Sequence, residues 1–302
     1  MSILIGFDIG GTNVKYMCTT DNFEFLEKGS FPTESEKGID CIINKFLAIH
    51  HQVENKYEKK VLAIGIGCTG PIDIETGIIQ NPYTLPGLEN QIFRDKMEQK
   101  LGIKIYIDND ANTAHLGEIS KNKILIHNSI MITFGTGIGC SIYINDNFLR
   151  VNGKKHPEIG HTIVSTSNTN EKCYCGKIHC AENILSGTAL NRDSRKLFGM
   201  TPEQVFDNPN TKEKEIFVQN IKRALYEVVL QLSIIFEPEE IIIGGGLESF
   251  YSQYLIKDLK DKISSMLPVF GKTNIRTSLL KNEAGSFGAI CTIIENQKRK
   301  EI

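Results

Sequence analysis

Gly6-Phe7-Asp8-Ile9-Gly10-Gly11-Thr12 is the stretch that decides the predicted fold. Its first four residues are the end of a predicted apolar strand, Ile3 to Ile9. Its glycines then lead into a second predicted strand, Val14 to Thr19. Because glycine has no Cβ, backbone N–H groups at this turn can approach a polyphosphate, with the Thr12 hydroxyl and the Asp8 carboxylate beside it. A plain hairpin turn is the alternative interpretation.

The same order of elements restarts in the middle of the chain. Ile130 to Phe134 is a predicted strand, Gly135-Thr136-Gly137-Ile138-Gly139 a turn, and Cys140 to Ile144 another strand. A dinucleotide-binding fingerprint would need Gly-x-Gly-x-x-Gly at the start of a helix. Here the spacing is Gly-x-Gly-x-Gly, and a β-branched strand follows. We therefore predict a second phosphate-binding turn and not an oxidoreductase site.

A third glycine turn, Gly244-Gly245-Gly246, follows the predicted buried strand Ile241 to Ile243 and precedes a helix. Such a turn can bring backbone against a nucleotide base or ribose, although a tight strand-to-helix connection would have the same sequence. Three glycine turns in this order are more specific than any one of them. They indicate a nucleotide held by backbone in a cleft, as in the actin-like ATPase fold.

Helices and strands alternate after each copy of this strand-turn-strand module. The further predicted strands are 23–31, 61–67 and 104–107, and the predicted helices are 39–53, 91–101, 182–197, 213–236, 249–266 and 286–296. The pattern predicts an α/β protein of two similar lobes with a cleft between them. We place the first lobe at residues 1–120 with 284–302 and the larger second lobe at residues 121–283.

An acidic segment, Asp108-Asn109-Asp110, directly follows the predicted strand 104–107 and starts a helix. An acid at the carboxyl end of a strand that faces a cleft can accept the proton of a sugar hydroxyl as it attacks a γ-phosphate. Asn109 beside it could hold another hydroxyl. The alternative is that Asp108 only caps the helix and that the segment is a solvated turn.

A metal site is predicted from a His-x11-Cys-x-Cys-x4-Cys pattern made by His161, Cys173, Cys175 and Cys180. Three thiolates and one imidazole match a closed tetrahedral zinc site of the structural kind. Four protein ligands leave no open position, which argues against a catalytic metal. His156 and His179 are close in sequence and are expected outside the ligand set.

Two glutamates flank the predicted metal ligands. Glu158 lies three residues before His161, and Glu182 lies two residues after Cys180. A metal that fixes these ligands would therefore also direct both carboxylates toward one pocket, where charged acceptors can bind several sugar hydroxyls. The alternative is that both glutamates are surface charges.

Composition argues against several classes of function. The chain has 302 residues, a formal net charge of −2 and eight cysteines. That charge is too small for a nucleic-acid or anionic-membrane surface, and no apolar run approaches the roughly 20 residues of a spanning helix. No signal peptide precedes Asp8. Cysteines in a large chain without an export signal favour a reduced, cytoplasmic setting.

Together these motifs resemble the ROK family (repressors, open reading frames and kinases) over essentially the whole chain. The resemblance rests on residues 6–12, 109–112, 135–139, 158–161, 173–176 with Cys180 and Glu182, and 243–246. It implies a two-lobed, actin-like (ribonuclease H-like) kinase that is usually a homodimer. It also implies that MgATP phosphorylates a hexose, usually at the 6-hydroxyl.

The resemblance implies roles for single residues, with Asp110 as the general base. The implied sugar-binding residues are Asn109, Glu158, His161, Glu182, Gly70 and Asn81. The implied MgATP-binding residues are Asp8, Gly10, Gly11, Thr12, Gly135, Thr136, Gly137, Gly244, Gly245 and Gly246. The implied zinc ligands are His161, Cys173, Cys175 and Cys180.

Three departures from the family pattern bear on the choice of sugar. Cys140-Ser141 replaces further glycines, His156-Pro157 replaces the small residues usual before Glu158, and His179 replaces a glycine. They leave the implied base and zinc ligands unchanged but alter the surroundings of the sugar pocket. Glucose is the favoured substrate, with N-acetylglucosamine, N-acetylmannosamine and fructose as alternatives.

Two other classes of function are alternatives to a sugar kinase. Some relatives carry an N-terminal DNA-binding domain, but here the first phosphate motif begins at Asp8 and no basic recognition helix precedes it. A catalytically silent sugar sensor would lose the base or a glycine turn, and this chain keeps them. The expected partners are therefore a small sugar and a second copy of the chain, without nucleic acid or membrane.

Overall fold

The structure, a computed structural model, describes residues 1–82, 84–122, 125–152, 155–266 and 272–298. Contacts divide the chain into two compact units. Unit 1 comprises Met1–Leu125, Arg150–His156 and Asn282–Ile302, and unit 2 comprises Ile126–Leu149 and Pro157–Lys281. The predicted lobe boundaries stay a prediction, and residues 299–302 of the first lobe lie outside the described part.

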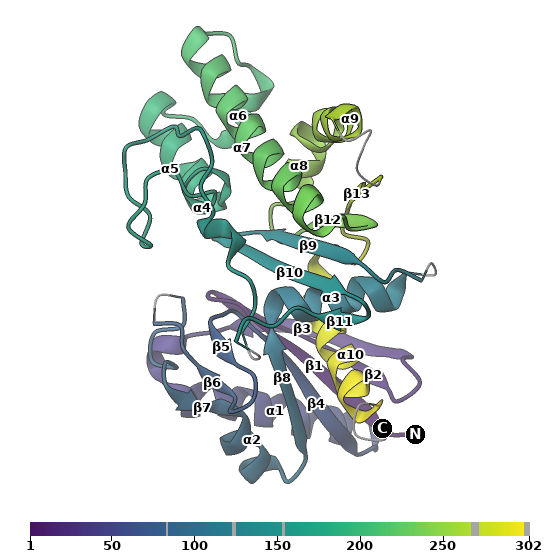
Figure 1. Cartoon of the computed structure of the whole chain (residues 1–302). Coiled ribbons are helices and arrows are strands. Elements are labelled where there is room, and N and C mark those ends of the chain that lie inside the picture. The colour runs from purple at the N-terminus through teal and green to yellow at the C-terminus, as the bar shows by residue number, and fades with distance from the viewer. Residues whose placement is uncertain (83, 123–124, 153–154, 267–271, 299–302) are drawn as a thin grey trace. The chain divides into compact units, whose positions relative to one another are not determined.

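Unit 1 is built on a five-stranded mixed sheet in the order β3-β2-β1-β4-β8 (Figure 1). Its strands are β1 (Ile3–Ile9), β2 (Asn13–Thr20), β3 (Phe25–Pro32), β4 (Val61–Cys68) and β8 (Lys104–Asn109). β2 pairs antiparallel with β1 and with β3, whereas β4 pairs parallel with β1 and with β8. The predicted strand-turn-strand opening and the third antiparallel strand are confirmed.

Helices cover both faces of this sheet, because alternate side chains of each strand point to opposite sides. The helices of unit 1 are α1 (Ile39–Tyr57), α2 (Phe93–Leu101), α3 (Asp110–Lys121) and α10 (Ala284–Lys298). On one face, Phe7 of β1 stacks on Phe46 of α1 with ring centroids 3.9 Å apart. On the other face, Leu4 packs with Ile290 of α10. The last helix therefore packs on the first strand, and α3 packs beside it (Figure 1).

A small antiparallel sheet that the sequence did not predict also belongs to unit 1. It consists of β5 (Ile72–Asp73), β6 (Ile78–Ile79) and β7 (Gln91–Ile92), in that order. The helix predicted at 91–101 begins two residues late, at Phe93, because Gln91 and Ile92 pair with β6 instead.

Unit 2 repeats the topology of unit 1 in a second five-stranded sheet, ordered β11-β10-β9-β12-β13. Its strands are β9 (Ser129–Phe134), β10 (Ile138–Ile144), β11 (Asn147–Phe148), β12 (Glu240–Gly244) and β13 (Asn274–Thr277). β10 pairs antiparallel with β9 and β11, and β12 pairs parallel with β9 and β13. The strand directions follow the same order as in unit 1, so the predicted repetition is confirmed.

Two predicted helices of unit 2 are each divided in the structure. The helices are α4 (Glu182–Leu185), α5 (Gly187–Phe198), α6 (Pro202–Asp207), α7 (Lys212–Phe236), α8 (Glu248–Tyr254) and α9 (Ile256–Met266). The first division is at Ser186, whose backbone is extended and whose hydroxyl caps α5 by accepting from Ala189 N. The second is at Leu255, which leaves helical geometry and enters the core. Among the described residues, no helix is long and apolar enough to cross a bilayer.

The core of unit 2 positions the end of β9, where the second glycine turn starts. Phe134, the last residue of β9, stacks on Tyr251 of α8 with ring centroids 4.0 Å apart. The Tyr251 hydroxyl is buried and donates to Leu185 O at 2.6 Å, at the end of α4. One buried tyrosine therefore ties the glycine turn to the helix that starts at Glu182.

The packing of α10 gives a test of the fold. A Cβ added to Gly288 would lie 1.6 Å from Thr113 O of α3, so Gly288→Ala must push two backbones apart. We expect it to lower the free energy of unfolding by about 2–3 kcal/mol, measured by urea denaturation. Gln297→Ala, at an exposed position of the same helix, should change it by less than about 0.5 kcal/mol. Equal effects of the two substitutions would contradict the close contact.

Candidate active site

The acidic segment lies where β8 ends and α3 begins, as predicted. The helix cap is Asn109, whose side-chain oxygen accepts from Ala111 N at 2.9 Å, so the alternative that Asp108 caps the helix is wrong. Asp108 is buried, and its carboxylate instead accepts from Arg150 Nη1 at 2.7 Å. Asp110 is the first residue of α3. The three polar residues thus differ in role: Asp108 forms an ion pair, Asn109 caps the helix, and Asp110 places a carboxylate in the first helical turn.

Asp8 at the end of β1 lies close enough to Asp110 for the two charges to interact. Burial and then the negative charge of Asp110 raise the pKa of Asp8 to about 7, while Lys15 opposes the shift. Burial also raises the pKa of Asp110, against the opposing effects of His156 and of hydrogen bonds that its carboxylate accepts. Two neighbouring carboxylates with raised pKa values are suited to proton transfer or to binding a cation.

The N-terminal turn of α10 borders this carboxylate pair. A Cβ on Gly285 would lie 2.4 Å from the Cγ atom of Asp8, so any side chain there would displace the carboxylate. Gly285 therefore provides the space that Asp8 occupies. The sequence contained no motif that pointed to it.

The loop after β4 brings three predicted sugar-binding residues together in unit 1. A Cβ on Gly70 would meet His156 Cε1 at 2.2 Å and Asn109 Nδ2 at 2.9 Å. Asn81 is buried; its Nδ2 donates to Gly70 O, and its Oδ1 accepts from Thr84 N at 2.8 Å. His156 is a neighbour of these residues for which the sequence predicts no role. Its only signal was that it stands where the family usually has a small residue.

The first glycine turn is a tight connection between β1 and β2. Gly10 N donates to Asn13 O at 3.1 Å, and Gly10 O accepts from the Thr33 hydroxyl at 2.6 Å. Gly11 faces Thr84 so closely that a Cβ would lie 2.6 Å from its Cγ2 atom. Thr12 is exposed. The backbone is therefore that of a hairpin turn. Its tip at Gly11 and Thr12 is exposed, so a phosphate could still bind there.

The other two glycine turns meet in unit 2. Gly245 has φ +89°, and a Cβ there would lie 2.5 Å from Phe134 O, just before Gly135. Gly135 O accepts from Gly187 N at 2.8 Å, at the start of α5. A Cβ on Gly246 would meet nothing within 4 Å, so this position faces open space. The structure thus places both turns at one edge of the second sheet.

The predicted zinc ligands converge. The ligand atoms of His161, Cys173, Cys175 and Cys180 all lie within 4.8 Å of one another. Ligand atoms of a tetrahedral zinc–thiolate site lie about 3.8 Å apart, given Zn–S bonds of about 2.3 Å. The Cys173 sulfur is 3.8 Å from Nδ1 of His161. The donor set and its spacing therefore fit a structural zinc ion, with Nδ1 as the imidazole ligand.

A tight cysteine turn, Cys173–Lys177, carries two of these ligands. Cys173 N donates to Lys177 O, and Gly176 N donates to Cys173 O, both at 2.8 Å. Gly176 has φ +86°, a left-handed conformation that favours glycine. Cys180 is held separately by a bridge to Ile163, which brings it beside His161. Local backbone hydrogen bonds thus place the ligands.

Glu182 connects the metal site to the second glycine turn. Its Oε2 accepts from Ile138 N at 2.9 Å, and a Cβ on Gly137 would lie 2.9 Å from the same oxygen. Glu158 precedes the short turn Ile159–His161, and its carbonyl accepts from His161 N at 3.2 Å. The alternative that both glutamates are plain surface charges is wrong for Glu182, whose carboxylate is fixed by backbone.

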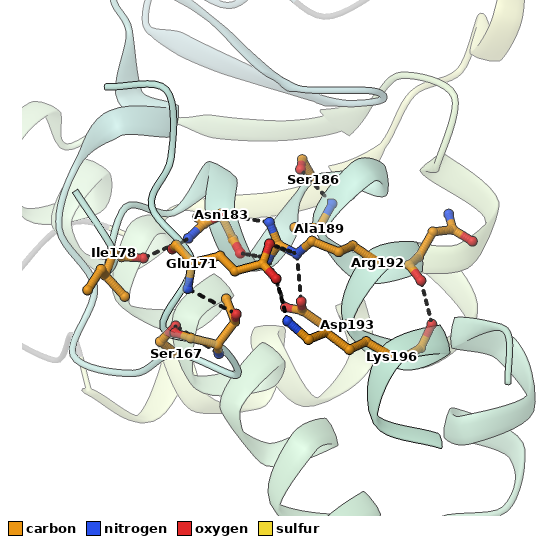
Figure 2. A network of polar contacts seen from close by, with 12 residues as sticks. Ser167, Glu171, Ile178, Asn183, Ser186, Ala189, Arg192, Asp193 and Lys196 are labelled. Carbon is orange, nitrogen blue, oxygen red and sulfur yellow. Dashed lines mark hydrogen bonds and ion pairs between the residues drawn. The ribbon is translucent and has the colours of Figure 1, made fainter. Parts of the chain in front are cut away.

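A polar network around Asn183 joins the two segments that flank the cysteine turn (Figure 2). Asn183 Nδ2 donates to Glu171 O at 2.7 Å and to Ile178 O at 2.9 Å, on either side of that turn. Arg192 Nη1 donates to Asn183 Oδ1 at 2.9 Å, and Lys196 pairs with the Glu171 carboxylate. Asn183 directly follows Glu182. No motif in the sequence points to this network, because its members are ordinary polar residues spread over 26 positions, from 171 to 196.

The fold and the site define a class of protein: a duplicated α/β fold of the actin-like ATPase type, with glycine turns at equivalent strand ends. A solved structure, a ROK family glucokinase from Streptomyces griseus in complex with glucose and AMPPNP, has this fold. The TM-score is 0.75 at 23% identity, and the match covers 96% of this chain and 98% of the other.

The chain belongs to the ROK family, whose model matches residues 4–296. The glucokinase of Halalkalibacterium halodurans is 31% identical over 313 residues, which covers 94% of this chain and 92% of the relative. The N-acetylmannosamine kinase of Escherichia coli is 26% identical over 262 residues, covering 85% and 88%. The resemblance seen in the sequence is confirmed.

The raised pKa of Asp8 predicts a pH dependence of stability. The folded state holds the Asp8 proton up to about pH 7, whereas the unfolded chain releases it near pH 4. This contribution to stability is therefore full below about pH 4 and is lost as the pH rises to about 7. Asp8→Asn should gain up to about 4 kcal/mol relative to wild type between about pH 4 and 8, measured by urea denaturation without added magnesium.

Asp95→Asn is the matched control, because the Asp95 side chain is 60% exposed. It should follow the wild-type pH profile. A difference between Asp8→Asn and wild type that does not change with pH would show that Asp8 has an ordinary pKa.

The polar network predicts a change in metal affinity. Asn183→Asp keeps the side-chain size but replaces the donor to two carbonyls by an acceptor. We expect a roughly 10- to 100-fold loss of zinc affinity, measured by competition with a chromophoric chelator. Asn191→Asp loses one bond to Gly187 O outside the metal loop, which is the segment 161–180 that carries the predicted zinc ligands. This variant should bind zinc as wild type does. Equal affinities of both variants would remove Asn183 from this role.

Proposed function

We propose that the protein is an ATP-dependent hexose kinase that transfers the γ-phosphate of MgATP to the 6-hydroxyl of a sugar, with glucose favoured. Membership of the ROK family supports a sugar kinase. The observation that carries the proposal is Asp110, a carboxylate in the first turn of α3 with a raised pKa, beside Asp8 and Asn109. N-acetylhexosamines and fructose are the alternative substrates.

Asp110 acts as the general base. A carboxylate with a raised pKa accepts a proton more readily than an ordinary one, and it need only hold that proton while the sugar oxygen attacks phosphorus. Asn109 orients the acceptor sugar: its oxygen accepts the cap hydrogen bond and one amide N–H donates to Asp110, so the remaining N–H, beside Gly70, is the part that can bind a hydroxyl. Asn81 holds the Gly70 loop through its two hydrogen bonds.

A second set of sugar contacts comes from unit 2. Glu158, His161 and Glu182 supply two carboxylates and an imidazole, which suit a ligand with several neighbouring hydroxyls. Glu182 is held by Ile138 N through one oxygen. His161 turns Nδ1 toward Cys173, so its Nε2 remains on the other side of the ring.

The three glycine turns bind the nucleotide. Gly10 N and Gly135 N donate to Asn13 O and Gly137 O within their own turns. The other backbone N–H groups of Gly10–Thr12 and Gly135–Gly137 contact phosphates, and the open space at Gly246 admits the nucleoside. Asp8 would hold the magnesium ion of MgATP, because two nearby carboxylates relieve their mutual repulsion on a hard divalent cation. When bound, the ion neutralises charge on the phosphates.

The four-ligand site would hold structural zinc, which supplies rigidity and no open coordination position. Its role here is to fix His161 and the cysteine turn. The homodimer and the cytoplasmic setting are further parts of this proposal, and they rest on the amino-acid sequence alone.

The test is release of ADP from MgATP with glucose, mannose, fructose, N-acetylglucosamine and N-acetylmannosamine. Asp110→Asn should lower turnover of the accepted sugar by about 10²- to 10⁴-fold, because the positioned base is lost while the fold and sugar contacts remain. Its sugar affinity, measured by calorimetry, should stay within a few-fold of wild type. Asp95→Asn should retain full turnover.

Two results would contradict the proposal in different ways. Normal turnover by Asp110→Asn would remove this residue from the role of base. Binding of a sugar by wild type without any turnover would instead make the protein a sugar sensor.

A further inference from the structure

Tyr174 occupies a position among the proposed sugar contacts of unit 2. It lies in the cysteine turn between two zinc ligands, and its ring meets the His161 ring edge-on at a centroid distance of 4.8 Å. Its hydroxyl is 2.7 Å from Nε2 of His161 and also hydrogen-bonds the Glu182 carboxylate. The side chain of this residue therefore contacts two of the three groups in that set.

The hydrogen-bond pattern around this hydroxyl is directional. An imidazole that ligates a metal through Nδ1 carries its proton on Nε2, so His161 donates and the Tyr174 oxygen accepts. The Tyr174 hydroxyl then donates to Glu182, which has only acceptors when ionised. A sugar hydroxyl bound by the same two groups would accept from His161 and donate to Glu182 in the same way.

We propose that the Tyr174 hydroxyl stands in for one sugar hydroxyl and competes with the substrate, so that Tyr174 sets the affinity for the sugar. This inference rests on the proposed function, which assigns His161 and Glu182 to the sugar. The tyrosine is displaced when the sugar binds and returns when it leaves.

The exposure of Tyr174 makes displacement easy. The residue is 63% exposed, so moving it into solvent uncovers little apolar surface. Its hydroxyl is held by two polar contacts that water or a sugar can replace. A sugar must break both before it forms its own, and this lowers the affinity only of sugars that carry a hydroxyl at this position. An analogue that lacks this hydroxyl leaves Tyr174 in place.

Tyr174→Phe separates this role from simple packing, because it removes the hydroxyl and keeps the ring against His161. We expect glucose, or the sugar that wild type binds best, to bind roughly 3- to 10-fold more tightly, measured by calorimetry. Among its 1-deoxy, 2-deoxy and 3-deoxy analogues, the one that lacks the competing hydroxyl should bind both proteins equally. Tyr254→Phe is the matched control, because it loses a 2.7 Å bond to Asp207 elsewhere in unit 2.

Zinc content is measured on each protein, because Tyr174 lies between two zinc ligands. Unchanged or weaker sugar affinity in Tyr174→Phe with full zinc content would overturn the proposal and leave the kinase function untouched. Loss of zinc in that variant would assign the hydroxyl to the metal loop, which also overturns it. Absence of any sugar binding by wild type would instead contradict the proposed function itself, and this inference with it.

Discussion

Unit 1 depends on a seam where α10 touches its neighbours backbone to backbone. A Cβ on Gly65 of β4 would lie 1.7 Å from Ala289 O, and one on Gly6 of β1 would lie 2.1 Å from Ser286 O. Such distances are possible only where side chains are absent, so α10 lies closer to the sheet than larger residues would allow. The same helix contacts α3, which starts at Asp110. Asp8 and Asp110 are close because the strand and the helix that carry them pack on one common helix.

Unit 2 has a comparable dependence on one short helix. Glu182, its first residue, accepts from the glycine turn after β9, and Asn183, its second, clamps both ends of the cysteine turn. Two consecutive side chains thus face two different parts of the proposed site. The division of the predicted helix 182–197 at Ser186 follows from this, because a continuous helix would direct α5 elsewhere than toward Gly135. The break at Ser186 therefore allows α4 to contact the segments that flank the cysteine turn while α5 starts at the second glycine turn.

The parts of the fold and site that could be predicted are those determined by residues close to one another in the sequence. The strands around Asp8, the glycine turns and the Cys-x-Cys spacing need only neighbouring residues, and the structure has them where they were expected. The rest depends on contacts between distant segments. Nothing near Asp108 in the sequence shows that it pairs with Arg150. Asn109, and not Asp108, is therefore the residue that caps the helix. The short helix α6 could have been found, because Thr201 and Gln204 form a capping box. The roles given to site residues, and the lobe boundaries, stay predictions.

The carboxylate pair also explains why unit 1 keeps an arrangement that reduces its own stability. Raising the pKa of Asp8 to about 7 means that its ionised form is disfavoured in the folded chain at neutral pH. An amide at either position would remove that penalty without changing the size of the side chain. Asparagine at position 8 would therefore be the more stabilising residue, and an aspartate at this place fits a role that uses its charge. A divalent cation and a transferred proton are the two things that such a pair can hold. A kinase that brings MgATP to a sugar hydroxyl needs both at one place.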